Sequence, residues 1–170
     1  MGMSNLHPVM EFGMRQSEAV ACLREKGFKQ ATLVLLFAAI DQLAWVASDK
    51  EMVGNDGFKA WVQQYMVDRN PELLSGATAA DLWGARCGVL HTGAAESNDF
   101  RKGDARPIHY SSNCGQVVSK DPTILTLSLE CLGTAFATAL VWFLNDLEND
   151  PVKDARAREK LARMLVDKQP

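Results

Sequence analysis

Apolar side chains recur every three or four residues along most of the chain, which is the spacing of one buried helix face. The repeat runs through residues 17–26, 28–48, 58–69, 78–91 and 150–165, and the first segment could begin as early as residue 5 or 8. The longest repeat consists of Leu125, Leu129, Leu132, Phe136, Leu140, Phe143 and Leu147. No run alternates apolar and polar residues as a half-buried strand does. The pattern predicts an all-α fold, a bundle of five or six helices.

Three of these segments begin with residues that cap helices. Residues 78–81 run from Thr to Asp and resemble a capping box. Asp121-Pro122 and Asp150-Pro151 each place a carboxylate before a proline at the first helical position. We therefore expect helices to begin at these three points, the longest of them at Pro122.

The longest polar stretch, residues 94–121, comes just before this longest helix. Within it, residues 107–118 carry Ile108, Tyr110, Val117 and Val118 around a polar turn sequence. This part predicts either a small β-hairpin or a long ordered loop, and long loops in compact domains are more often functional than idle. We expect one domain over residues 1–170, with residues 94–121 as an insertion.

Composition is typical of a globular protein. Of the 170 residues, 47% are hydrophobic and 23% are charged, which excludes wholesale disorder. The formal net charge of -3 gives no overall attraction to polyanions. If the chain binds nucleic acid, it must therefore do so at a local basic patch.

The four cysteines, Cys22, Cys87, Cys114 and Cys131, are widely separated. All of them except Cys114 lie in apolar stretches that are predicted to be helical. We expect buried free thiols rather than a disulfide framework. The first residues show no basic segment followed by an apolar run, so we expect no signal peptide and a cytoplasmic location. Residues 122–144 are long enough to span a bilayer, but hydroxyl side chains dilute them and no basic flank marks both ends. A central bundle helix has the same composition, and we expect no membrane contact.

Arg86 and His91 are the main candidates for chemistry, at the end of a predicted helix. Residues five apart on an unbroken α-helix point about 140° apart, so the helix must end or distort for the two to converge, or a second copy must contribute. Gly88 and Gly93 make such an ending plausible. A guanidinium and an imidazolium close together would suit a phosphate. The alternative is that His91 hydrogen-bonds the last carbonyls of its helix while Arg86 pairs with a neighbouring acid.

Asp41 stands in the middle of the most apolar of the early helices, on the same face as Phe37 and Ala44. A buried carboxylate needs a partner, and Arg86 is the simplest candidate. Such a pair would fix the guanidinium in place. The alternative is that Asp41 pairs with a surface lysine.

Further polar residues follow His91 in the insertion. Glu96 could orient an imidazole or accept a proton. A cluster of basic side chains, Arg101, Lys102 and Arg106, could hold a phosphate backbone, with His109 and Tyr110 beside it. A solvated loop explains the same residues. No metal-ligand spacing, phosphate loop or dinucleotide-binding sequence is present, so we expect neither a metal nor a cofactor.

A helical bundle with R-x-x-x-x-H near the end of an inner helix resembles the HEPN superfamily, whose members are α-helical domains. The specific part of the resemblance is Arg86 to His91. It implies a metal-independent endoribonuclease of a toxin–antitoxin, antiphage or stress system, with Arg86 and His91 catalytic and the site shared across a homodimer interface. Asp41 loosely matches an acidic residue on an earlier helix of that family.

Two other functions stay open. Active members of the superfamily often carry Asn, Asp or His after the arginine, whereas this chain carries Cys87. Inactive members act as binding partners, for example of minimal nucleotidyltransferases, so a non-catalytic dimerisation or interaction module is the second hypothesis. A small-molecule-binding bundle is the third; it would use the indole rings of Trp45, Trp61, Trp83 and Trp142.

Overall fold

The computed structural model describes residues 6–92, 98–115 and 119–164. Within them the chain is mostly helical, with α1 (Pro8–Glu25), α2 (Lys29–Ala47), α3 (Asn55–Val62), α4 (Ala79–Cys87), α5 (Asn98–Lys102), α6 (Leu129–Glu148) and α7 (Pro151–Arg163). Two π-helical segments, η1 (Gln63–Val67) and η2 (Gly88–Thr92), continue α3 and α4. The strands are β1 (Ile108–Ser111) and β2 (Leu125–Ser128). The predicted helical fold is confirmed, although the described residues hold seven α-helices and a strand pair.

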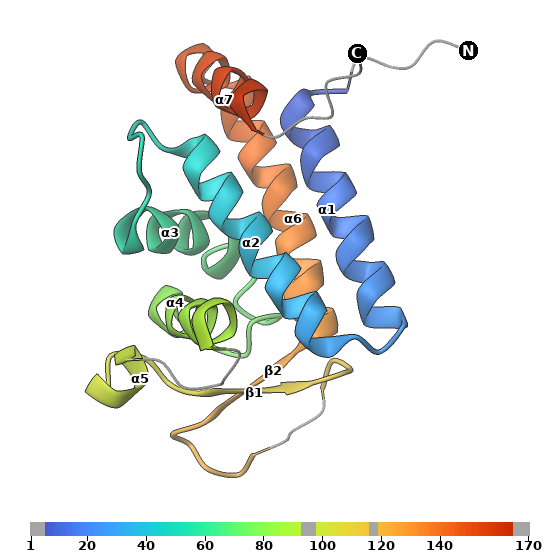
Figure 1. Cartoon of the computed structure of the whole chain (residues 1–170), viewed down its shortest axis with the longest axis vertical. Helices are drawn as coiled ribbons and strands as arrows, with labels where there is room; N and C mark the ends of the chain where they lie inside the picture. Colours follow the sequence, from blue (N-terminus) through green and yellow to red (C-terminus); the bar gives the residue numbers. More distant parts are fainter. Residues whose placement is uncertain (1–5, 93–97, 116–118, 165–170) are drawn as a thin grey trace.

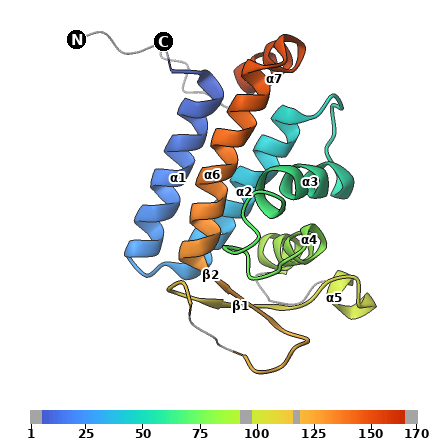
Figure 2. The same ribbon diagram turned by 180° about the vertical axis from the view of Figure 1, so that it is seen from behind.

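Three long helices, α1, α2 and α6, lie side by side and form the centre of the molecule (Figures 1 and 2). Helix α7 packs at one end of this group, and the strands lie at the opposite end. Helices α3 and α4 lie on the side of α2 that faces away from α1. The core between these layers is apolar, and its largest fully buried side chains include Phe37, Phe58, Phe136 and Phe143.

Close contact between α1 and α6 depends on a glycine. A Cβ atom at Gly13 would lie 2.5 Å from Cδ2 of Leu140, closer than carbon atoms approach without a shift. Leu140 belongs to the apolar stripe that the sequence places on one face of the longest helix, and it is buried. The stripe is therefore a core face, as predicted.

The predicted helix start at Pro122 is wrong. Asp121 accepts hydrogen bonds from the backbone and the hydroxyl of Thr123, which make a local turn. Residues 125–128 then form β2, and α6 begins after Ser128, whose Oγ accepts from the backbone N–H groups of Glu130 and Cys131. The start at Asp150 is confirmed, because its carboxylate caps α7 in the same way.

The strand pair replaces the predicted hairpin. β1 pairs with β2 in parallel, with Ile108 opposite Leu125 and Ser111 opposite Ser128. A hairpin needs adjacent antiparallel strands, whereas the partner of β1 lies beyond the connection of residues 112–124. The insertion is therefore tied to β2, the strand that leads into α6, and Val117 and Val118 lie outside the described residues.

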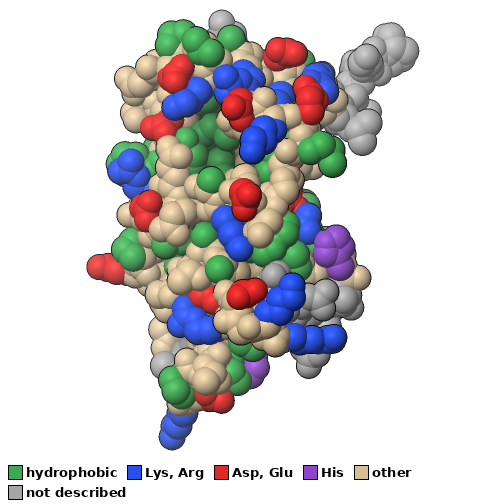
Figure 3. All heavy atoms as spheres, turned by 90° about the vertical axis from the view of Figure 1, so that its left-hand side faces the viewer, with side chains coloured by type: hydrophobic (Ala, Val, Ile, Leu, Met, Phe, Trp, Pro, Cys, Tyr) green, Lys and Arg blue, Asp and Glu red, His purple; other side chains and the backbone are tan. Residues whose placement is uncertain are grey.

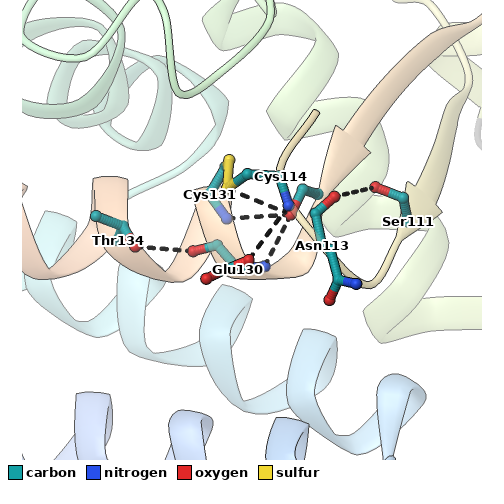
Figure 4. Close-up of a disulfide and its surroundings, with 7 residues drawn as sticks. Ser111, Asn113, Cys114, Glu130, Cys131 and Thr134 are labelled. Atoms are coloured by element: carbon teal, nitrogen blue, oxygen red, sulfur yellow. Dashed lines mark hydrogen bonds between the residues drawn. A yellow bond between two sulfur atoms is a disulfide. The ribbon is translucent and has the colours of Figure 1, made fainter. Parts of the chain in front are cut away.

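Cys114 and Cys131 form a disulfide, which corrects the expectation of free thiols (Figure 4). The Cα atoms are 5.7 Å apart, because the parallel strands bring the turn after β1 to the first turn of α6. The backbone N–H of Cys114 also donates to the Glu130 carboxylate at 3.2 Å. Cys22, expected to be buried, is exposed.

Helix α2, rather than residues 122–144, is the described helix that is long and apolar enough to cross a bilayer. A buried core helix passes the same test, and α2 contributes Leu36, Phe37, Ile40 and Leu43, all completely buried. Its composition is explained by the core of a soluble domain.

Candidate active site

Helix α4 carries Arg86, and its start is fixed by the predicted capping box. Thr78 Oγ1 accepts a hydrogen bond from the backbone N–H of Asp81 at 3.1 Å, and the Asp81 carboxylate accepts one from the backbone N–H of Thr78 at 2.9 Å. Asp81 also accepts from the backbone and the guanidinium of Arg106, at 2.7 and 2.6 Å. Burial raises the pKa of Asp81, but these hydrogen bonds outweigh it and leave the pKa below its ordinary value. The hydrogen bonds between Asp81 and Arg106 therefore connect the start of α4 to the segment just before β1.

The end of α4 is distorted, as convergence of Arg86 and His91 requires. The helix continues as the π-helical turn η2, Gly88–Thr92, in which hydrogen bonds join residues five apart rather than four. Arg86 Nη1 and His91 Nε2 are 2.9 Å apart. Both residues belong to one chain, so the contact itself needs no second copy. Single π-turns inside helices are rare overall, and those that occur often lie at functional sites.

Asp41 of α2 holds the guanidinium from the other side. Arg86 donates from Nε and Nη2 to the same oxygen, Oδ2 of Asp41, at 2.8 and 2.6 Å. The side chains are 18% and 27% exposed, so water only partly screens the pair. Burial lowers the pKa of Arg86, but contacts with Asp41 and Cys87 outweigh it and raise the pKa. The guanidinium is therefore a permanent cation in a fixed orientation.

The hydrogen bond to Arg86 defines the state of the His91 ring. A guanidinium has five N–H donors and no acceptor, so Nε2 of His91 accepts this bond with its lone pair. In this geometry the imidazole is neutral, with its hydrogen on Nδ1. His91 is exposed, so its ring also meets solvent or a ligand.

Two contacts of Arg86 were not predicted from the sequence. Its Cζ atom lies 5.1 Å from the ring centroid of Trp83, within the range of a cation–π interaction. The signal was present, because Trp83 and Arg86 are three residues apart on one helix and therefore lie on one face. A hydrogen bond with Cys87 also raises the pKa of the Arg86 side chain, whereas we expected a thiol packed in the core at this position.

The candidate residues of the insertion lie elsewhere or serve other contacts. Arg106 is occupied by Asp81 and by the carbonyl of Gly76, at 2.8 Å. Its role in the described structure is to anchor α4. Arg101 and Lys102 are exposed on α5, which packs on α4 through Phe100: a Cβ atom at Gly84 would lie 2.7 Å from the Phe100 ring.

Two further candidates, His109 and Tyr110, lie on β1. His109 is exposed, whereas Tyr110 is half-buried. Burial raises the pKa of the Tyr110 phenol, whose oxygen has no hydrogen-bond partner among the described residues. Glu96 lies outside the described residues.

The Arg86 side chain is 18% exposed and His91 is exposed, so the pair reaches the surface. Neither the cavity of about 630 Å³ beside α3 nor that of about 390 Å³ beside β2 is lined by Arg86, His91 or Asp41. Within the described part of the chain, no three His, Cys, Asp or Glu side chains gather as a metal site. The arrangement can therefore bind an anion and move a proton on a surface open to a large ligand.

Comparison with known proteins adds no identification. No family model matches the chain, and neither a curated protein nor a solved structure matches it.

Proposed function

We propose that this chain is a HEPN-like, metal-independent endoribonuclease that uses Arg86, His91 and Asp41. The observation that carries the proposal is the π-turn after α4, which brings Nε2 of His91 within 2.9 Å of an Arg86 guanidinium already held by Asp41. A neutral imidazole beside a fixed cation suits proton transfer next to a phosphate.

The chemistry follows from the substrate. The 2′-hydroxyl of RNA is an internal nucleophile that can attack the adjacent phosphorus. Nε2 of His91 gives up its hydrogen bond from Arg86 when the substrate binds and accepts the 2′ proton; the bond to the 5′ oxygen breaks, and a proton returns to that oxygen from a second acid. The products are a 2′,3′-cyclic phosphate and a 5′-hydroxyl. Arg86 stabilises the charge that develops on the phosphorane, and Asp41 positions Arg86.

A homodimer would supply the second acid. One Arg86–His91 set provides one imidazole, whereas cleavage by this route uses a base and an acid. A two-fold interface would bring two such sets together. We place this assembly in the cytoplasm. The Cys114–Cys131 disulfide counts against this placement, because disulfides persist mainly in oxidising compartments. Its proposed partners are RNA and an antitoxin.

The test is incubation of the purified protein with mixed single-stranded RNA in EDTA. We expect the parent protein to cleave the RNA and the His91→Ala and Arg86→Ala variants to cleave it at least about 100-fold more slowly. This is the range typical of removing an acid–base or charge-stabilising group. Arg15→Ala is the matched control, because Arg15 is exposed on α1 and pairs with Glu11. Cleavage that survives His91→Ala would contradict the proposal.

The alternative is a non-catalytic module that dimerises or binds a minimal nucleotidyltransferase. Cys87 directly after Arg86 and the absence of the Arg86–His91 pair from both cavities favour this alternative. It predicts no cleavage by any variant, together with a dimer in sedimentation that Arg86→Ala weakens.

A further inference from the structure

A second region of the molecule has the features of a ligand site and shares no residue with the Arg86 group. It is a cavity of about 630 Å³ between the end of α2, the loop that follows it, α3 and the end of α6. Pockets of 300–1,000 Å³ are the usual size for small-molecule sites. Figure 3 faces this side of the molecule, and apolar side chains line a hollow in its upper half.

The wall of the cavity is aromatic. Trp61, Tyr65 and Phe143 all line it and contact one another, with ring centroids 5.3 to 6.1 Å apart. These three residues are 3%, 6% and 1% exposed, so they form the floor of the cavity and most of each ring is covered by the core. Such a wall favours a flat, largely apolar ligand.

Trp61 also carries an unsatisfied donor, which lies below the surface of the cavity. Nε1 of Trp61 is buried and has no hydrogen-bond partner among the described residues. Leaving a buried donor without an acceptor costs about 1–3 kcal/mol. The indole of Trp45 on α2, by contrast, donates to the carbonyl of Glu51 at 2.9 Å. A ligand with an acceptor atom would therefore satisfy the free N–H group of Trp61.

The rim is held by contacts within the chain. Lys160 of α7 donates from Nζ to the carbonyls of Trp45, Ser48 and Lys50, at 2.7 to 2.8 Å, and is 4% exposed. Arg163 pairs with Glu51 at 2.8 Å. These contacts hold the loop after α2 in the shape that forms one side of the cavity. A preformed site needs little ordering when a ligand binds.

The charges around the mouth select a neutral ligand. Two acidic side chains, Asp49 and Asp56, and two basic ones, Lys50 and Lys153, line the cavity. Their formal charges sum to zero, and counting Asp150, which pairs with Lys153 at 3.3 Å, makes the sum -1. Such a rim does not attract an anion, and its net charge is too small to select a cation.

We propose that this cavity binds a neutral aromatic heterocycle of one or two rings that accepts a hydrogen bond from Nε1 of Trp61. The ring packs on Tyr65 and Phe143, and a small movement of the Trp61 ring brings the buried N–H to the ligand. This inference is independent of the proposed ribonuclease activity.

Quinoline and naphthalene form a matched pair of probes, because they share shape and differ in one acceptor nitrogen. We would titrate the ¹⁵N-labelled full chain with each probe and follow the indole N–H signals, with Trp61→Phe identifying the signal of Trp61. Quinoline should shift that signal and bind roughly 2- to 10-fold more tightly than naphthalene, the contribution of one hydrogen bond. Trp61→Phe should abolish this preference.

Ala60→Phe serves as the blocking variant, because Ala60 is an exposed residue that lines the cavity, so the larger ring fills space without entering the core. It should remove quinoline binding while leaving the thermal unfolding midpoint unchanged. An unperturbed Trp61 signal, or shifts that persist in Ala60→Phe, would overturn the proposal. Equal binding of the two probes would also overturn it and would indicate a pocket for an apolar side chain of a partner protein.

Discussion

The ion pair between Asp41 and Arg86 can be tested by truncating each partner alone and both together. Asp41→Ala removes the single oxygen that accepts two guanidinium N–H groups. Arg86→Ala removes those donors, together with the contacts to His91 and Trp83. The double variant completes a cycle in which contacts not shared by the pair cancel, leaving the coupling energy between Asp41 and Arg86.

The exposure of the pair sets the expected magnitude. An exposed ion pair contributes about 0–1 kcal/mol, and breaking a fully buried one costs about 3–5 kcal/mol. Asp41 and Arg86 lie between these limits, at 27% and 18% exposure, with two short hydrogen bonds. We expect a coupling energy of about 1.5–2.5 kcal/mol in the free energy of unfolding.

The assay is equilibrium unfolding in urea, with the slope compared among variants to confirm that each unfolds in one step. The pair Glu11–Arg15 provides the control, because it is also a carboxylate and an arginine but is 48% and 74% exposed. Its coupling energy should be about 0.5 kcal/mol or less. A coupling between Asp41 and Arg86 no larger than the control would refute the view that α2 fixes the guanidinium.

Three further measurements address the anchors of the fold. Lys160→Met removes a donor shared by three carbonyls while keeping the apolar stem, so the free energy of unfolding should fall by about 1–3 kcal/mol; a loss under about 0.5 kcal/mol would contradict this. The pKa of Asp81 is below its ordinary 3.8 in the fold, because hydrogen bonds from Arg106 and residue 78 outweigh burial. Its contribution to stability is therefore present above pH 3.8 and is lost as the pH falls through the lower folded value, and Asp81→Asn should flatten this acid loss in a pH series of urea midpoints. Reducing the Cys114–Cys131 disulfide, which spans 17 residues, should lower the free energy of unfolding by about 3 kcal/mol, and the Cys114→Ser variant should show no effect of reductant.

The local rules of helix formation were readable from the sequence. The apolar stripe that includes Phe136 and Leu140, the capping box at residues 78–81 and the start at Asp150 depend on side chains within a few residues of one another. The start at Pro122 failed because Asp121 caps a turn as readily as a helix, and the choice depends on pairing between β1 and β2.

The candidate site likewise has features that the sequence predicts and features that only the tertiary structure decides. The sequence by itself determined that Asp41, on an apolar helix, needs a partner and that Arg86 and His91 can meet within one chain only if their helix ends or distorts. The tertiary structure decided that the distortion is a π-turn and that Asp41 reaches Arg86 across 45 positions of the chain. It also brought Cys114 to Cys131 and opened a cavity beside Trp61. These features arise from packing between distant segments, and a periodic pattern records which side chains are buried but not which of them meet.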